Sequence, residues 1–156
     1  MKIIGISGNA TVGKDSYCHA LIDLLSVHGI SAERYAFADE LKYETDEFLK
    51  SSLGISAFTT DKEEKVLIRS FLVWWGTDFR RKLDDSHWIN KVNDKIKDDK
   101  TVYIITDVRY QNEFEWLKNN NGLSIFLDRV VNGLDSNNMP NKIQPGNEYE
   151  RVNNKW

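Results

Sequence analysis

The sequence predicts an α/β protein in three layers, with a parallel sheet of four to five strands and helices on both faces. Short apolar runs rich in β-branched residues alternate with longer segments of helical periodicity, as in parallel strands joined by crossover helices. The first apolar run is followed by a glycine-rich turn, Gly8 to Asp15, and then by a helix-like segment. This order of strand, turn and helix is typical of a phosphate-binding loop, so the predicted fold class is the P-loop NTPase fold.

The glycine-rich turn has the pattern G-x-x-x-x-G-K from Gly8 to Lys14. The glycines allow the backbone to bend so that successive N–H groups point at phosphate oxygens. The helix that follows adds its own N–H groups and its positive dipole end. Lys14 is expected to reach the β- and γ-phosphates of a nucleotide. The predicted nucleotide-binding residues of this turn are Gly8, Ala10, Val12, Gly13, Lys14, Asp15 and Ser16.

Asp15 departs from the usual pattern, because Ser or Thr normally stands there and supplies a hydroxyl group to magnesium. A carboxylate is also a hard oxygen ligand that suits Mg²⁺. The alternative is an acidic first-turn residue that is favoured by the helix dipole. A negative charge beside a triphosphate makes sense when a cation lies between them, so we favour a metal role, which Ser16 would share.

Composition narrows the class of protein. The 156 residues fit one domain, 1–156, and a net charge of −3 argues against broad electrostatic binding to nucleic acid. The single cysteine, Cys18, cannot form an internal disulfide and is expected to be a small buried hydrophobic residue. No segment reaches membrane-spanning length and the N-terminus enters a strand at once, so we expect a cytoplasmic protein without a membrane partner. The oligomeric state is left open between monomer and homodimer.

The first half of the chain is expected to hold two strands and two helices, with a loop from Ile55 to Thr60. The expected elements are a strand over 2–7, a helix from Ser16 to His28 stopped by Gly29, a strand from Ser31 to near Phe37, and a helix from its N-cap Asp39 to about Ser52, ended by Gly54.

The second half begins with a long helix that is capped by Asp61 or Thr60 and that Gly76 breaks or bends. The next elements are a helix over 88–96 with Ser86 as cap, a strand over 101–106, a helix through Phe114 and Leu117, and a strand over 123–127. From Asn132 the chain is rich in Asn, Gly and Pro, which predicts a lid-like loop at about 132–146 or a poorly ordered tail.

Polar residues follow three of the predicted strands. In open parallel sheets the ligand lies beyond the carboxyl ends of the strands, so the glycine-rich turn, Asp39, and Asp107 with Arg109 should converge. Asp107 is similar to the acidic residue that positions magnesium in phosphate-loop enzymes. The alternative role for Asp107 is a helix N-cap.

An ordered set of motifs runs through most of the chain. It comprises Gly8 with Gly13-Lys14-Asp15, Phe37-Ala38-Asp39-Glu40-Leu41-Lys42, Trp75-Gly76-Thr77-Asp78-Phe79-Arg80-Arg81, Trp88-Ile89, and Thr106-Asp107-Val108-Arg109-Tyr110-Gln111-Asn112-Glu113. Taken together, these residues resemble the deoxynucleoside monophosphate kinases of bacteriophages over roughly Met1 to Arg129. The resemblance implies a nucleoside-monophosphate-kinase-like fold, ATP and Mg²⁺ as the donor complex, and a deoxynucleoside monophosphate as the acceptor.

The tail departs from the family pattern, which continues with one more strand and helix, so the fifth strand and some adenine contacts are in doubt. Phosphomevalonate kinases of the metazoan type share several of the same motifs and are the alternative. A nucleotide-binding module without turnover is the rival of another class. Lys14, together with acidic and arginine candidates on separate strand ends, speaks against such a module.

Phosphoryl transfer brings two phosphate-bearing substrates together, so several cations should point inward. Lys14, Arg80 and Arg109 are the catalytic candidates, with Arg80 or Arg81 facing solvent. Lys42 is expected to bind the acceptor phosphate, and Trp75 or Tyr43 to stack on a base. Of the adjacent Trp74 and Trp75, one should be core. The full set of predicted acceptor-binding residues is Asp39, Lys42, Tyr43, Arg69, Trp75, Arg80, Arg81 and Arg109, and Arg129 is assigned to the donor nucleotide.

Overall fold

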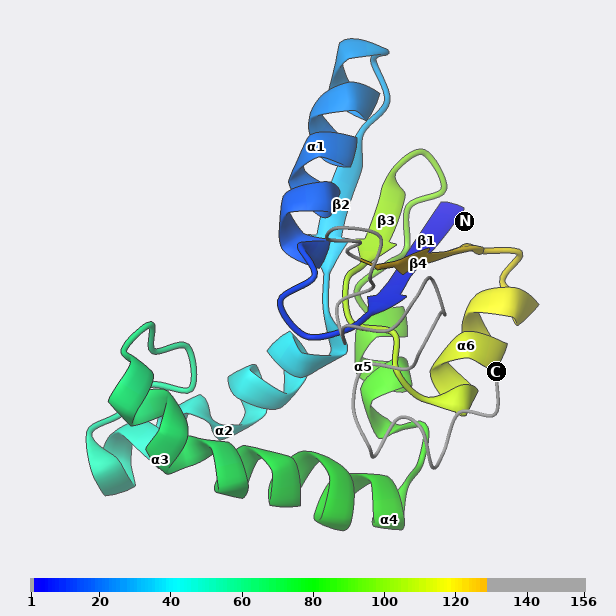
Figure 1. The fold of residues 1–156 in the computed structure, drawn as a ribbon. Coiled ribbons are helices and arrows are strands. Elements are labelled where there is room, and N and C mark those ends of the chain that lie inside the picture. The colour runs from blue at the N-terminus through cyan, green and yellow to red at the C-terminus, as the bar shows by residue number, and fades with distance from the viewer. Residues whose placement is uncertain (1, 129–156) are drawn as a thin grey trace. The chain divides into compact units, whose positions relative to one another are not determined.

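The computed structural model describes residues 2–128, and Figure 1 shows their fold. The chain divides into two compact units. The sheet unit comprises Met1–Tyr35 and Ile96–Trp156, and the helical unit comprises Ala36–Lys95. The predicted lid at 132–146 and Arg129 lie outside the described residues. Along the described part, no helix is both long and apolar enough to cross a membrane.

Up to residue 128, where the description ends, the sheet unit contains four strands and two helices: β1 (Lys2–Gly8), α1 (Lys14–Val27), β2 (Ala32–Tyr35), β3 (Val102–Ile105), α6 (Gln111–Asn119) and β4 (Leu123–Leu127). The strands lie in the order β2-β3-β1-β4 and all pair in parallel. β1 therefore lies inside the sheet, between β3 and β4. Four parallel strands agree with the predicted fold class.

Helices α1 and α6 cover opposite faces of this sheet (Figure 1). Ile6 packs with the buried Cys18 of α1, as part of a cluster that includes Leu21 and Leu25. The neighbouring residue of β1, Gly5, faces the other way, because a Cβ atom there would lie 2.5 Å from Leu117 of α6. Successive strand residues point to opposite faces, so the sheet carries one helix on each side. The three-layer prediction is confirmed.

The predicted burial of Cys18 is also confirmed, since its side chain is fully buried. Burial raises the pKa of the thiol, an effect that the nearby Arg34 guanidinium partly offsets. A buried thiol with a raised pKa is a packing residue and a poor nucleophile.

The helical unit is built from α2 (Phe37–Leu53), α3 (Lys62–Val73), the π-helix η1 (Trp74–Arg80), α4 (Arg81–Leu83) and α5 (His87–Asn93). α2 packs against both α3 and α5. The core between α2 and α3 contains Leu49, Ala57 and Ile68, with Phe71 and Leu72 packed against it. Asp61 caps α3 as predicted, because its carboxylate accepts hydrogen bonds from the N–H groups of Glu63 and Glu64.

Several predicted boundaries differ from those in the structure. β2 ends at Tyr35 and α2 begins at Phe37 with Ala36 as N-cap, so Asp39 lies in the first turn of the helix instead of capping it. The buried Phe37 explains the early start, since packing of an aromatic side chain outweighs the preference for a polar cap. α5 ends at Asn93, before the predicted Ile96.

Gly76 does not break the long helix. The backbone continues from α3 into η1, in which Gly76 is buried. A Cβ atom at Gly76 would lie 2.9 Å from Leu41, so the glycine allows α2 to approach closely. The helix widens here to a π-helix, which the predicted 3.6-residue periodicity does not reveal.

Candidate active site

The loop between β1 and α1 has the backbone of a phosphate-binding turn. Gly8, Thr11 and Gly13 adopt positive φ angles of 139°, 63° and 103°. Gly13 is the N-cap of α1, which starts at Lys14. Backbone of this kind turns N–H groups toward a common point beside a helix N-terminus, as anion-binding loops do.

Lys14 folds back over this loop. Its Nζ atom donates hydrogen bonds to the carbonyl oxygens of Gly8 and Asn9, each at 2.7 Å. These two hydrogen bonds hold the ammonium group against the backbone of its own loop. A nucleotide phosphate would offer it a charged acceptor in their place.

Asp15 lies in the first turn of α1 with a side chain that is 70% exposed. Its carboxylate accepts a hydrogen bond from Nε of Arg34 on β2 at 3.2 Å. Ser16 is exposed beside it. Within residues 2–128 there is no ready-made cluster of three or more metal-binding side chains.

The turn after β3 lies against β1, the strand that leads into the glycine-rich loop. The N–H group of Val108 donates to the carbonyl oxygen of Ile6 on β1, at 3.2 Å. Because β1 and β3 are parallel neighbours, the loop and the segment from Asp107 to Arg109 follow the same edge of the sheet. Asp107 is not a helix N-cap, since Tyr110 has that position before α6.

A buried carboxylate fixes this turn. Glu113 of α6 is 1% exposed and accepts hydrogen bonds from the N–H groups of Arg109 and Tyr110, at 2.7 and 3.1 Å. The side chain of Arg109 is exposed. Glu113 was not predicted to have this role, although a glutamate at the third helical position is one half of a capping box.

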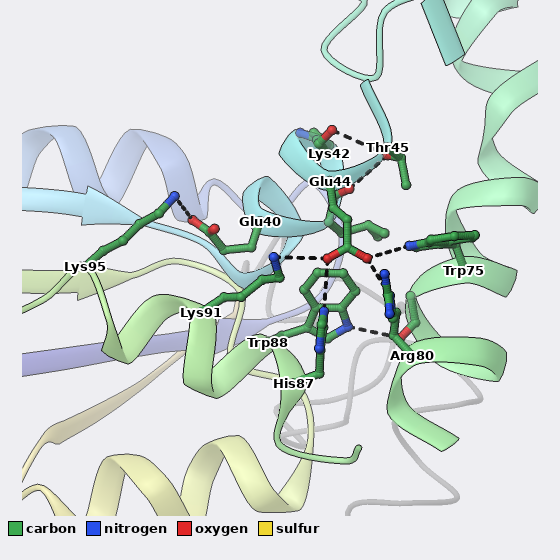
Figure 2. A network of polar contacts seen from close by, with 12 residues as sticks. Glu40, Lys42, Glu44, Thr45, Trp75, Arg80, His87, Trp88, Lys91 and Lys95 are labelled. Carbon is green, nitrogen blue, oxygen red and sulfur yellow. Dashed lines mark hydrogen bonds and ion pairs between the residues drawn. The ribbon is translucent and has the colours of Figure 1, made fainter. Parts of the chain in front are cut away.

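The helical unit contains a second polar centre, the Glu44 cluster, which comprises Glu44, Trp75, Arg80, His87 and Lys91 (Figure 2). One carboxylate oxygen of Glu44 accepts hydrogen bonds from Nε1 of Trp75, at 2.9 Å, and from Nε of Arg80. The other oxygen lies 3.0 Å from Nε2 of His87 and 3.1 Å from Nζ of Lys91. A single carboxylate thus meets donors from η1 and α5.

The electrostatics of Glu44 follow from these contacts. Burial alone would raise the pKa of Glu44, but hydrogen bonds from Trp75, His87, Lys91 and Arg80 outweigh it and lower the pKa to about 2. The carboxylate is therefore ionised at neutral pH. The Arg80 guanidinium also lies over the rings of Trp75 and Phe79, with its carbon 5.1 and 5.6 Å from their centroids.

Two further acceptor-site candidates on α2, Lys42 and Tyr43, lie beside Phe58. The Nζ atom of Lys42 lies 3.4 Å from Oδ1 of Asp39 and 5.4 Å from the ring centroid of Phe58. Tyr43 is exposed and packs against Phe58 with ring centroids 4.9 Å apart, while Lys95 covers its ring at 4.8 Å. Tyr43 is thus an exposed aromatic ring with one ammonium group over it, that of Lys95.

Some predictions fail at the level of single side chains. Neither tryptophan of the adjacent pair is core, because Trp74 is exposed and Trp75 only half-buried; Trp88 is the buried one. Arg80 and Arg81 are both half-buried, so burial does not tell which of the two faces solvent. Arg69 is exposed on α3 and does not join the Glu44 cluster.

The parallel sheet and the glycine-rich loop define an α/β protein of the P-loop class. Residues 30–139, more than half of the chain, match the family of deoxynucleotide monophosphate kinases, and the chain belongs to this family. The match begins after the loop, so the loop at Gly8 to Lys14 is separate evidence. No curated protein matches the chain. Among solved structures, a gluconokinase from Sinorhizobium meliloti 1021 is similar, with a TM-score of 0.41, 14% identity, and coverage of 80% of this chain and 56% of the gluconokinase.

Proposed function

We propose that the protein transfers the γ-phosphoryl group of ATP to a deoxynucleoside monophosphate, giving the diphosphate and ADP. The observation that carries this proposal is the phosphate loop at the carboxyl end of β1, in a chain of the deoxynucleotide monophosphate kinase family. Such a reaction needs positioned phosphates and surrounding positive charge more than covalent help from the protein.

ATP and Mg²⁺ are the proposed donor complex. The positive-φ loop and the ammonium group of Lys14 fit a triphosphate, which is the ligand that such a backbone binds. Asp15, Ser16 and Asp107 offer hard oxygen ligands from one unit, so they would hold the magnesium ion. When bound, the ion would neutralise charge on the phosphates. Arg129 stays a proposed donor-site residue, and 132–146 a proposed lid.

The proposed acceptor site draws on the helical unit. Arg80 and Lys42 supply positive charge, and Arg109 stays a proposed acceptor-binding and catalytic residue. Tyr43 is the better candidate for base stacking, because Tyr43 is exposed, whereas Trp75 is half-buried and its ring nitrogen donates to Glu44. Asp39, Arg69 and Arg81 remain candidates for contacts with the acceptor.

The setting that fits this function is the cytoplasm, where the partners are small nucleotides and neither nucleic acid nor a membrane is bound. The protein is proposed to act there as a monomer or a homodimer. The net charge of −3 supports the exclusion of nucleic acid.

An acceptor panel tests the proposal. ATP consumption would be measured with Mg²⁺ and each deoxynucleoside monophosphate, with phosphomevalonate, and without an acceptor. We expect turnover of at least one deoxynucleoside monophosphate. The Lys14→Met protein should fold and lose activity a few hundred-fold, because a transition-state contact of roughly 3–4 kcal/mol is removed.

The other outcomes identify the rivals. Turnover of phosphomevalonate alone would keep the donor site and replace the acceptor. Binding of ATP without turnover of any acceptor would indicate a nucleotide-binding module. Near-normal activity of a folded Lys14→Met protein would contradict the phosphate-loop assignment.

A further inference from the structure

The Glu44 cluster holds more positive charge than an ion pair needs. Arg80 and Lys91 bring two positive charges to the one negative charge of Glu44, and His87 adds a third when it is protonated. We propose that Glu44 is a positioning residue that assembles Arg80, His87 and Lys91 into the binding site for the phosphate group of the acceptor nucleotide. This assignment rests on the proposed function.

The layering of the cluster supports an anion site. The Glu44 side chain is 13% exposed, whereas those of Arg80, His87 and Lys91 are 31%, 21% and 38% exposed. The carboxylate therefore lies inside and the basic groups lie toward solvent. An incoming anion meets the cations first, and their geometry is already set by the carboxylate behind them.

The π-helix explains why two donors of η1 reach one carboxylate. Trp75 and Arg80 are five positions apart, so on an α-helix their side chains would point about 140° away from each other. The wider turn of a π-helix brings residues at this spacing onto one side. Trp74 and Phe79, at the same spacing, stack with centroids 5.6 Å apart. The π-helix thus places Arg80 against both Glu44 and the ring of Trp75.

Two other ion pairs of the helical unit lack this excess of charge. Lys95 pairs with the buried Glu40, and Lys50 pairs with Asp46. Asp46 also accepts hydrogen bonds from the hydroxyl group of Ser56 and from the N–H group of Ala57. Each pair has one lysine for one carboxylate. These pairs tie elements of the unit together and leave no net positive charge.

Comparing a nucleotide with its nucleoside isolates the contribution of the phosphate group. Calorimetric titration would give the affinities of the preferred deoxynucleoside monophosphate and of its parent deoxynucleoside, without ATP. The proteins are the wild type, Lys91→Gln, Glu44→Gln and the matched control Lys50→Gln. The ratio of the two affinities reports phosphate recognition alone, and a parallel titration with ATP reports the donor site.

We expect Lys91→Gln and Glu44→Gln each to lower this ratio about tenfold, the scale of one charge-assisted hydrogen bond. Nucleoside and ATP affinities should stay at wild-type values, and Lys50→Gln should retain the ratio. The direction in which Glu44→Gln changes the affinity ratio decides between two roles for Glu44. Removing a negative charge would strengthen phosphate binding if Glu44 acted through charge alone, whereas lost positioning weakens it.

An unchanged or higher ratio in folded Glu44→Gln would overturn the positioning role. Should Glu44→Gln not fold, as judged by near-UV circular dichroism, Lys91→Gln decides, and an unchanged ratio there overturns the site. If the wild type binds the nucleotide no more tightly than the nucleoside and phosphorylates no deoxynucleotide, the proposed function itself fails. Wild-type turnover with unchanged ratios in the variants refutes only the inference.

Discussion

At the residue scale, Lys14 and Arg80, two of the three proposed catalytic cations, donate hydrogen bonds to different kinds of acceptor. Lys14 donates to two neutral carbonyl groups of its own loop, whereas Arg80 donates to the ionised carboxylate of Glu44. Hydrogen bonds to a charged acceptor are roughly twice as strong as those between neutral groups. In the proposed complex an incoming phosphate would give the ammonium group of Lys14 a charged acceptor, whereas Arg80 already has one in Glu44.

The proposed magnesium role of Asp15 can be tested by substitution. In the proposed donor complex it holds Mg²⁺, so Asp15→Ala should raise the magnesium concentration needed for half-maximal activity. Asp15→Ser should retain more activity, since a hydroxyl is the usual magnesium ligand at this loop position. The measurement is a magnesium titration of turnover. Equal magnesium dependence in the wild type and Asp15→Ala would leave Asp15 as the partner of Arg34 and of the helix dipole.

The low pKa of Glu44 predicts an acid-sensitive helical unit. Its folded-state pKa of about 2 lies below its ordinary value of 4.5, so its contribution to stability is complete above about pH 4.5. The contribution is lost as the pH falls through 2, because the unfolded chain takes up the proton first. Urea unfolding between pH 5 and 2 should show a steeper loss of unfolding free energy for the wild type than for Glu44→Gln.

Glu47→Gln controls for the loss of one carboxylate, because Glu47 is exposed on the same helix. Parallel pH curves for the wild type and Glu44→Gln would contradict the prediction. They would show that the hydrogen bonds of Glu44 do not favour its charged form in solution.

At the scale of elements, the strands and most helices could be predicted from apolar periodicity and from turn residues such as Gly29 and Gly54. The π-helix could not be predicted from these signals. Its sequence has the spacing of an ordinary amphipathic helix, and the widened turn depends on contacts with α2, including the close approach of Leu41 to Gly76. The cap of α2 was missed for a similar reason, since burial of Phe37 decided where that helix begins.

Gly8 connects the phosphate loop to the sheet. A Cβ atom at this position would lie 2.2 Å from the carbonyl oxygen of Leu127 on β4, and the φ angle of 139° disfavours any side chain. Gly8→Ala should therefore lower the unfolding free energy by roughly 2–5 kcal/mol, from backbone strain plus overpacking. Chemical denaturation measures this loss.

Gly29→Ala is the matched control, because Gly29 has a φ of 69° with open space around it. It should cost only the backbone strain, about 1–2 kcal/mol. Equal losses for the two variants would mean that β4 moves away from the loop without cost.

At the scale of the whole molecule, the sequence was sufficient to predict the parallel sheet, the phosphate loop and its edge of the sheet. The Glu44 cluster could not be predicted from the sequence, although Arg80 and Trp75 were predicted site residues. Trp75, Arg80 and His87 lie 31, 36 and 43 positions from Glu44. No local pattern connects residues at such separations, and a glutamate within an amphipathic helix has the appearance of an ordinary surface residue.

The division into two units predicts that each substrate protects its own part of the chain. The donor is proposed to bind the loop of the sheet unit, and the acceptor phosphate the Glu44 cluster of the helical unit. A ligand slows amide exchange where it stabilises the closed backbone. In hydrogen-exchange mass spectrometry, Mg-ATP alone should protect residues 8–17, and the deoxynucleoside monophosphate alone should protect residues 74–91. Lys14→Met should lose the first effect and keep the second. Protection of 74–91 by Mg-ATP alone, with none at 8–17, would reverse the assignment of donor and acceptor to the two units.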